Sequence, residues 1–177
     1  GRLGADALGS LAIALAVFTL AFAVFNFLAY GTTPMIARAI GGDDRSAAGR
    51  IALTATVVGA GLGVITAIVV AIFATPFLEV LGAGPDTLAG AERYLRIRAL
   101  ALPAMMLVTV GHGVFRGYQD TRTPMIVTFG LNAVNLILDP IFIFGLDAGL
   151  AGAAWATVVA QWFGAGWFLL LLAVRRN

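Results

Sequence analysis

Five long apolar runs dominate this sequence and constrain its fold more than any other feature. They cover residues 11–30, 51–73, 99–115, 125–144 and 150–174 with few polar interruptions. About 20 helical residues cross the ~30 Å hydrocarbon core of a bilayer, because an α-helix rises 1.5 Å per residue. None of the runs alternates apolar and polar residues as a barrel strand does. We therefore predict an all-α membrane protein, a bundle of five transmembrane helices near residues 7–40, 47–81, 88–117, 123–145 and 149–174.

The composition agrees with residence in a membrane. Hydrophobic residues make up 60% of the chain and charged residues 11%, against about 25% charged in soluble domains. No cysteine is present, which excludes a disulfide framework and a thiolate metal site. All eleven basic residues are arginines, mostly at the ends of apolar runs, which indicates topology rather than nucleic-acid binding. We expect the lipid bilayer as a partner, no nucleic acid, no cofactor and no resident metal.

The positions of the arginines predict the orientation of the chain. One set of span ends holds seven arginines and the opposite set four, namely Arg38, Arg45, Arg50, Arg116, Arg122, Arg175 and Arg176 against Arg2, Arg93, Arg96 and Arg98. The positive-inside rule then puts the loops near 41–50 and 116–122 and the C-terminus in the cytoplasm of a multi-pass protein of the cell membrane. The first run would enter from outside, so we expect one more helix before residue 1. The chain begins with glycine and shows no signal peptide, and the sequence leaves open whether it is a fragment.

Asp139 is the one acidic residue well inside an apolar run. Asn135 lies four residues earlier on the same helix face, and Asn132 lies about one turn before that. Pro140 follows and should bend the helix beside the carboxyl group. Intramembrane carboxylates are costly and usually functional, and desolvation favours their neutral form. We expect Asp139 to bind and release a proton, although it lies only ~9 Å from the outer span end and could instead reach interfacial water.

Other polar residues inside the runs are weaker candidates for a cavity lining. Asn26 suits either an interhelical hydrogen bond or a cavity wall. His112 could be a protonatable cavity residue or a hydrogen-bonded packing residue. Thr157 and Gln161 are four residues apart and could line the same cavity as Asp139. Thr157 could equally bond to its own helix backbone.

Local signals predict where helices bend, pack and begin. Pro103 should kink the third span. The run from Gly59 to Gly63 predicts close helix packing through small residues. Asp86 or Thr87 is a plausible helix N-cap.

The ordered motifs of this chain resemble those of the multidrug and toxic compound extrusion (MATE) transporters, within them the DinF-like branch. The resemblance covers essentially the whole chain. It is carried by Gly1-Arg-Leu-Gly-Ala-Asp-Ala-Leu-Gly, Ala37-Arg-Ala-Ile-Gly-Gly-Asp-Asp, Phe115-Arg-Gly-Tyr-Gln-Asp-Thr-Arg-Thr-Pro, Asn135-Leu-Ile-Leu-Asp-Pro, Phe144-Gly and Gly152-Ala-Ala.

This resemblance implies that residues 1–177 are part of the N-terminal lobe of a twelve-helix transporter, helices 2–6 without the first. It implies a secondary active antiporter that exports drugs or toxic amphipathic, often cationic, compounds by alternating access. Its cation or proton site would include Asn135 and Asp139, with a possible Na⁺ there, and Thr157 and Tyr94 are carried over as neighbours. His112 stands where an asparagine is expected. The first-helix aspartate of the site and the remaining helices of the full transporter would lie outside this chain.

Three alternatives remain beside the antiporter. A lipid-linked oligosaccharide flippase of the same superfamily should display a basic central cavity. A non-transporting membrane packing or sensor protein should lack a polar cavity around Asp139. An intramembrane enzyme finds no support, because no span carries a flanked nucleophile or clustered metal ligands. The sequence leaves open the substrate, the choice of H⁺ or Na⁺ as coupling ion and the oligomeric state.

Overall fold

The structure, a computed structural model, describes residues 9, 11–16, 19 and 26–176, with the side chains of 26–29 and 175–176 excepted. Residues 11–16 are helical. Within the described part the chain forms helices and no strand. The elements in chain order are α2 (Asn26–Gly41), α3 (Arg45–Ile72), α4 (Ala74–Val80), α5 (Pro85–Ala99), α6 (Leu102–Gly117), α7 (Arg122–Pro140), the π-helix η1 (Ile141–Gly145) and α8 (Gly149–Arg176).

Several of these helices are long and apolar enough to cross a membrane. In the described part they are α3, α7 continued into η1, and α8 over Gly149–Val174. The pair α5 and α6 adds a fourth span if the two count as one bent helix. The first predicted span, 7–40, is described only in pieces before Asn26.

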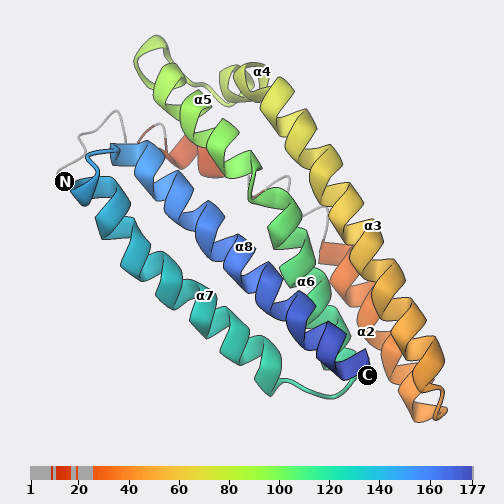
Figure 1. Cartoon of the computed structure of the whole chain (residues 1–177). Coiled ribbons are helices and arrows are strands. Elements are labelled where there is room, and N and C mark those ends of the chain that lie inside the picture. Colours follow the sequence, from red (N-terminus) through yellow and green to blue (C-terminus); the bar gives the residue numbers. More distant parts are fainter. Residues whose placement is uncertain (1–8, 10, 17–18, 20–25, 177) are drawn as a thin grey trace.

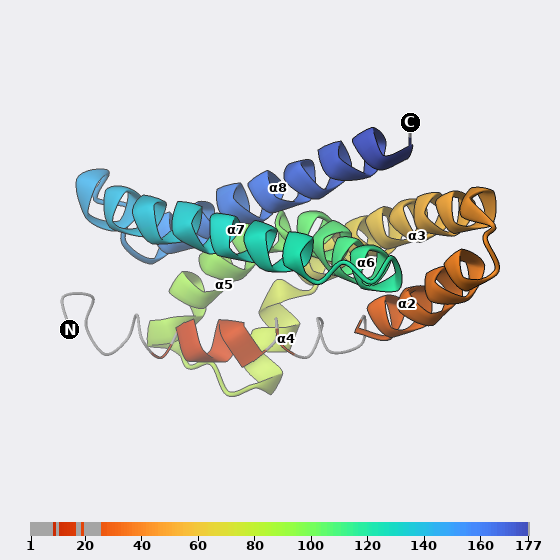
Figure 2. The same cartoon turned by 90° about the horizontal axis from the view of Figure 1, so that it is seen from below.

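Helix α6 lies at the centre of the bundle. It packs against α2 and α3 on one side and against α8 on the other, and α7 packs along α8 (Figures 1 and 2). The long helices run side by side from one end of the molecule to the other (Figure 1). The α2–α3 and α6–α7 connections and the C-terminus share one end of the bundle (Figure 1). The arginine-rich connections of the orientation argument therefore lie together in space.

The third predicted span is broken where Pro103 predicts a bend. Leu100 and Ala101 separate α5 from α6, and the two helices are bent by 49°. Pro103 stands in the first turn of α6, where its missing N–H costs nothing. The break leaves the Leu100 carbonyl outside the helical ladder, and Trp162 of α8 donates its indole N–H to that oxygen at 3.1 Å.

Glycine at position 63 allows α3 to approach this break closely. A Cβ at Gly63 would lie 2.6 Å from the Cα of Pro103. Gly59, one turn earlier, is also buried, whereas Gly61 is exposed, and a Cβ placed there would meet nothing within 4 Å. Gly63 thus makes the close packing that the glycine run predicts.

Two helix boundaries differ from the sequence expectation. The span predicted over 47–81 is divided at Phe73 into α3 and the short α4. Helix α5 begins at Pro85 with Gly84 as its N-cap, so neither Asp86 nor Thr87 caps it. Proline favours the first helical position because its fixed φ is already helical, and this moves the start ahead of the side-chain caps.

The end of the α7 span changes its hydrogen-bond pattern directly after the intramembrane aspartate. Pro140 has no N–H to donate to the preceding turn, and the next five residues form η1, in which the Leu146 N–H reaches the Ile141 carbonyl at 2.9 Å. A π-helical turn of this kind often accompanies a functional site. Pro140 therefore does change the local geometry, through a wider turn rather than a broken helix.

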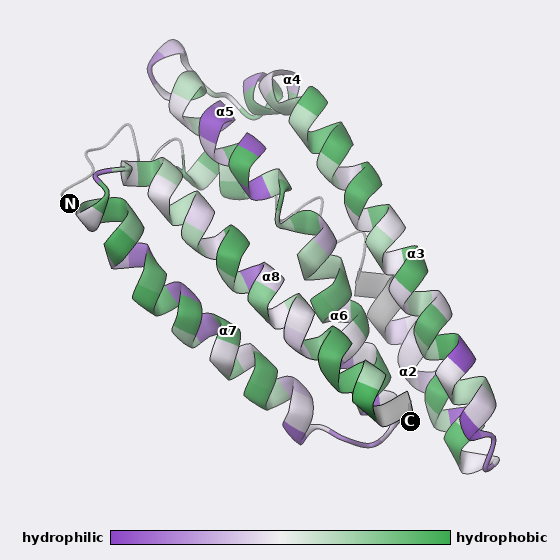
Figure 3. Ribbon diagram, viewed as in Figure 1, coloured by the Kyte–Doolittle hydropathy of each residue, from purple (hydrophilic) through white to green (hydrophobic). Residues whose placement is uncertain are grey.

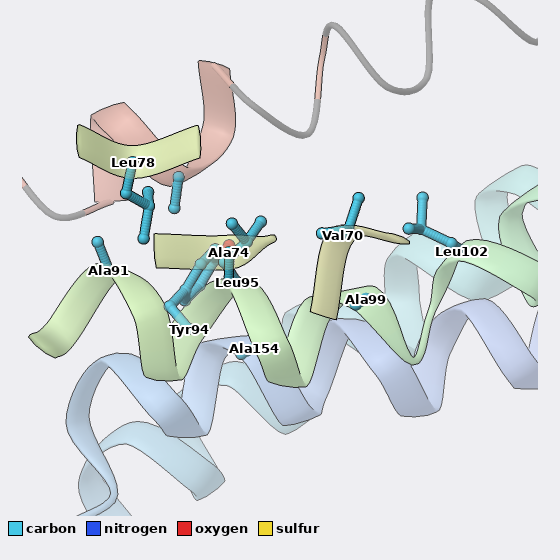
Figure 4. Close-up of a cluster of buried hydrophobic side chains, with 10 residues drawn as sticks. Val70, Ala74, Leu78, Ala91, Tyr94, Leu95, Ala99, Leu102 and Ala154 are labelled. Carbon is cyan, nitrogen blue, oxygen red and sulfur yellow. The ribbon is translucent and has the colours of Figure 1, made fainter. Parts of the chain in front are cut away.

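A buried cluster beneath α5 joins the helices at the other end of the bundle from the arginine-rich connections. Figure 4 shows Leu78 of α4, Ala91, Tyr94 and Leu95 of α5, and Ala154 of α8 meeting in this cluster. Hydrophobic residues make up most of the long helices (Figure 3), as expected where lipid replaces water.

Candidate ion-coupling site and cavity

Asp139 lies on α7 facing polar side chains of α7 and α8. The Asn135 amide nitrogen lies 3.5 Å from the Asp139 Oδ1 and 3.4 Å from the Thr157 hydroxyl oxygen. The Thr157 hydroxyl donates to the Ala153 carbonyl of its own helix at 3.0 Å. Both amide distances exceed the 2.7–3.2 Å typical of firm hydrogen bonds. The carboxyl oxygens are therefore only lightly engaged and can accept a proton or another ligand.

Helix α5 contributes a buried arginine and a buried tyrosine beside this carboxyl group. Arg98 is 7% exposed and Tyr94 is 5% exposed. Both side chains interact electrostatically with Asp139, and with each other. Arg98, one of the arginines expected at span ends, is instead buried in the bundle. A buried guanidinium compensates the charge of an ionised Asp139 and so reduces the cost of its burial.

We call these five residues, Tyr94, Arg98, Asn135, Asp139 and Thr157, the Asp139 cluster. Sequence reasoning missed Arg98 as a member. The sequence places three arginines near the end of one helix. Arg93 and Arg96 are exposed there, whereas Arg98 is buried. Arg98 is four residues after Tyr94, so the two share a helix face, and that spacing could have singled it out.

A glycine of α8 allows a close contact between α8 and η1, the segment that follows Asp139 and Pro140. A Cβ at Gly152 would lie 2.5 Å from the Phe142 carbonyl oxygen. Only glycine fits this approach without moving backbone. The π-helix and α8 thus pack backbone against backbone, and Thr157 lies little more than one turn along α8 from that contact.

A separate cavity of about 430 Å³ lies between α2, α6, α7 and α8. We call it the His112 cavity. Its lining comprises Tyr30, Thr33, Met105, Val108, Thr109, His112, Arg116, Thr128, Leu131, Asn132 and Gln161. His112 Nε2 lies 3.1 Å from the Thr128 hydroxyl, and its ring meets Phe168 edge-on with centroids 5.3 Å apart. His112 is therefore both a packing residue and a cavity residue.

The structure divides the polar side chains that sequence analysis assigned to one cavity. Thr157 belongs to the Asp139 cluster, whereas Gln161 and Asn132 line the His112 cavity, which Asp139 does not line. Gln161 thus lines the His112 cavity without Asp139, and a cavity common to these two residues stays a prediction. A rotation of about 100° per residue turns Gln161 slightly away from Thr157, and the bend at α5–α6 places different neighbours beside each.

The two sites are nonetheless neighbours along two helices. Asn132 and Asn135 are three residues apart on α7, a rise of about 4.5 Å, and Thr157 and Gln161 are four apart on α8, a rise of about 6 Å. Asn132 donates its amide to the Thr128 carbonyl at 2.8 Å. Asn135 thus lies about one helical turn from the cavity residue Asn132, and Asp139 lies about two turns from it.

The oxygen atoms of the Asp139 cluster are the available ligands for a coupling cation. Asp139 offers a carboxylate and Thr157 a hydroxyl, and reorientation of the Asn135 amide would present its carbonyl oxygen. Within the described residues no group of three or more His, Cys, Asp or Glu side chains could hold a metal ion. The side chain of Asn26, the remaining sequence candidate, lies outside the described part.

Comparison with known proteins decides the family. A family profile described as MatE matches residues 1–141 of the chain. The chain belongs to the MatE family. Similar curated MatE relatives include DETOXIFICATION 43 of Arabidopsis thaliana, 41% identical over 70% of this chain and 24% of its own length. DNA damage-inducible protein F of Escherichia coli is 31% identical over 96% of this chain and 36% of its own length. Multidrug export protein MepA of Staphylococcus aureus is 28% identical over 92% of this chain and 36% of its own length.

Solved MatE-family structures match the fold closely. Structures described as the inward-facing and the outward-facing conformation of a multidrug resistance MATE family transporter of the MOP superfamily each give a TM-score of 0.92 at 28% identity. Each match covers 99% of this chain, and 40% and 39% of the respective solved chains. The chain therefore spans about two fifths of those transporters, as part of their helical bundle. The expectation that the chain is not an enzyme agrees with these relatives, which are transporters.

Proposed function

We propose that this chain forms part of a secondary active antiporter that exports drugs or toxic amphipathic compounds by alternating access. The observation that carries the proposal is the Asp139 cluster, in which a carboxyl group lies near the Asn135 amide and interacts electrostatically with the buried Arg98, about two helical turns from a drug-sized cavity. A group that gains and loses charge in an apolar setting changes the stability of its surroundings with each event. Binding and release of H⁺ or Na⁺ at Asp139 would thereby bias two conformations of the transporter.

One further observation supports alternating access, and a second supports the orientation of the chain. The described helices match the inward-facing and outward-facing structures equally well. Such equal similarity supports movement of this unit as one body, with access changing at its boundaries. The shared end of the α2–α3 and α6–α7 connections supports their proposed cytoplasmic location, in the cell membrane, through the positive-inside rule.

The charge of Arg98 is relevant to whether H⁺ or Na⁺ is the coupling ion. The buried Arg98 guanidinium acts electrostatically on Asp139 and so supplies part of the positive charge that a bound Na⁺ would supply. A proton needs no coordination shell. We therefore favour H⁺ over Na⁺ as the ion that Asp139 exchanges.

The test is Asp139→Asn in the full-length natural protein, assayed in inside-out membrane vesicles with a fluorescent substrate. Asparagine keeps the size of the side chain and cannot exchange a proton. We expect proton-driven efflux to fall at least about tenfold, while equilibrium binding of substrate persists. Asp147→Asn, an exposed acid in the η1–α8 connection, is the matched control. Unchanged proton-driven efflux in the Asp139 variant would remove this residue from the mechanism.

A flippase for lipid-linked oligosaccharide is the second candidate, because Arg116 gives the His112 cavity one of the basic residues that such a protein should display. The cavity volume within this chain, however, suits a drug-sized molecule. Export of a small fluorescent substrate, without movement of a labelled glycolipid between leaflets, would separate the two functions.

A further inference from the structure

The lining of the His112 cavity contains basic side chains and no carboxylate among the described residues. The basic side chains are those of His112 and Arg116. A concave site lined by one sign of charge with apolar walls concentrates ligands of the opposite sign. The charge of the lining therefore selects against a cationic ligand.

Arg116 is available to such a ligand. It is exposed on the last turn of α6, and within the described part of the chain no hydrogen bond or ion pair engages its guanidinium. Its charge acts on the ring of His112, which lies one turn deeper on the same helix. An anion placed between them would meet a guanidinium and an imidazole on one face of α6.

The neutral lining adds hydrogen-bonding groups around an apolar floor. Thr128 and Asn132 are held by bonds to His112 and to the α7 backbone. Gln161 makes no hydrogen bond within the described part and presents both amide groups. Val108 and Leu131 supply apolar contact. The arrangement fits a molecule with one charged end and a compact apolar body.

We propose that the His112 cavity binds a small amphipathic carboxylate, with its negative group on Arg116 and its apolar body against Val108 and Leu131. This inference names the substrate class of the exporter proposed above, and it rests on that function. It departs from the often cationic cargo that the family resemblance implied, because a cation would find no acidic partner in this lining.

The experiment compares two probes with the same apolar body and opposite charge, 2-naphthoate and 2-naphthylmethylammonium. Calorimetry measures their binding to the full-length natural protein in phosphatidylcholine nanodiscs, without an ion gradient. We expect naphthoate to bind at least about tenfold more tightly than the ammonium probe. Arg116→Gln should weaken naphthoate binding about tenfold, and Arg116→Lys should retain most of it.

The matched control is Arg122→Gln, which removes an exposed arginine at the start of α7 that does not line the cavity. Circular dichroism checks that each variant keeps its helices. Tighter binding of the ammonium probe, or equal loss in Arg116→Gln and Arg122→Gln, would overturn the proposal. Asp139→Asn should leave naphthoate binding unchanged. If gradient-driven export is lost and binding is intact, the proposed binding site stands. If export and binding are both unchanged, only the coupling function of Asp139 is rejected.

Discussion

The nearest residues of the Asp139 cluster and the His112 cavity lie about one helical turn apart. The two regions differ in whether their charged side chains have an opposite charge nearby. In the cluster, an acid is matched by a buried arginine and lies among side chains of α5, α7 and α8. In the cavity, the basic side chains have no acidic partner among the described lining residues and face about 430 Å³ of open space. A compensated charge needs no outside partner, although protonation of the acid leaves the arginine uncompensated, whereas the basic side chains of the cavity need a partner from outside. This difference fits the proposed ion exchange in the first region and the proposed ligand binding in the second.

The largest expected effect tests the compensation in the Asp139 cluster. Arg98→Gln removes the buried guanidinium and leaves Asp139 without its opposite charge, so the free energy of unfolding should fall by about 3 kcal/mol. Denaturant or thermal unfolding in detergent micelles measures this change. Adding Asp139→Asn to Arg98→Gln should recover much of the loss, because the second change removes the uncompensated acid.

Arg96→Gln is the control for that experiment. Arg96 is 53% exposed and pairs with Glu92 at 2.7 Å, and exposed pairs contribute only about 0.5 kcal/mol. If Arg98→Gln destabilised the chain no more than Arg96→Gln, Arg98 would contribute no more to stability than an exposed arginine, and the proposed charge compensation of Asp139 would be rejected.

A smaller effect tests whether the two regions can be disturbed separately. Gly152→Ala would place a Cβ 2.5 Å from the Phe142 carbonyl oxygen, forcing η1 and α8 apart at a cost of about 2 kcal/mol. Because η1 adjoins Asp139 and not the cavity, unfolding should show the loss while naphthoate binding stays within about twofold.

Gly166→Ala, on the same helix with nothing within 4 Å of its Cβ position, should be neutral or stabilising by up to about 1 kcal/mol. Equal destabilisation by the two substitutions would mean that the contact with η1 is not what position 152 provides.

The smallest effect concerns the break between α5 and α6. Trp162→Phe removes the indole donor to the Leu100 carbonyl and should cost about 1 kcal/mol. Hydrogen exchange should quicken at the Ala101 amide, which donates to the Arg98 carbonyl at 2.9 Å. Trp155→Phe, on the same helix and without a hydrogen bond in the described part, is the control, and matching exchange in both variants would argue against the indole bond as a brace.

The sequence predicted best those features that depend on a single helix. The 3.6-residue repeat puts Asn135 and Asp139 on one face whatever surrounds them, and their observed proximity follows. Pro103 and Pro140 lack an N–H in any context, so altered geometry beside each was predictable. The form it takes, a break at Leu100–Ala101 and a π-helix after Pro140, was not, because it depends on what α8 offers as a partner.

Sequence reasoning failed where a role depends on the neighbour across a helix interface. Arg98 counts as a topology signal in the sequence and compensates Asp139 in the fold. Gln161 was placed with Asp139, and it lines the His112 cavity, which Asp139 does not line.

The sequence by itself determined that this chain is a helical membrane protein and that one of its helices contains a carboxyl group. Those properties follow from the length of apolar runs and from bonding inside a single helix, both of which are local. Only the tertiary structure decided which charge faces Asp139 and which polar residues surround open space. Such pairings depend on helix rotation and on the 49° bend between α5 and α6, and these are set by packing between segments distant in the chain.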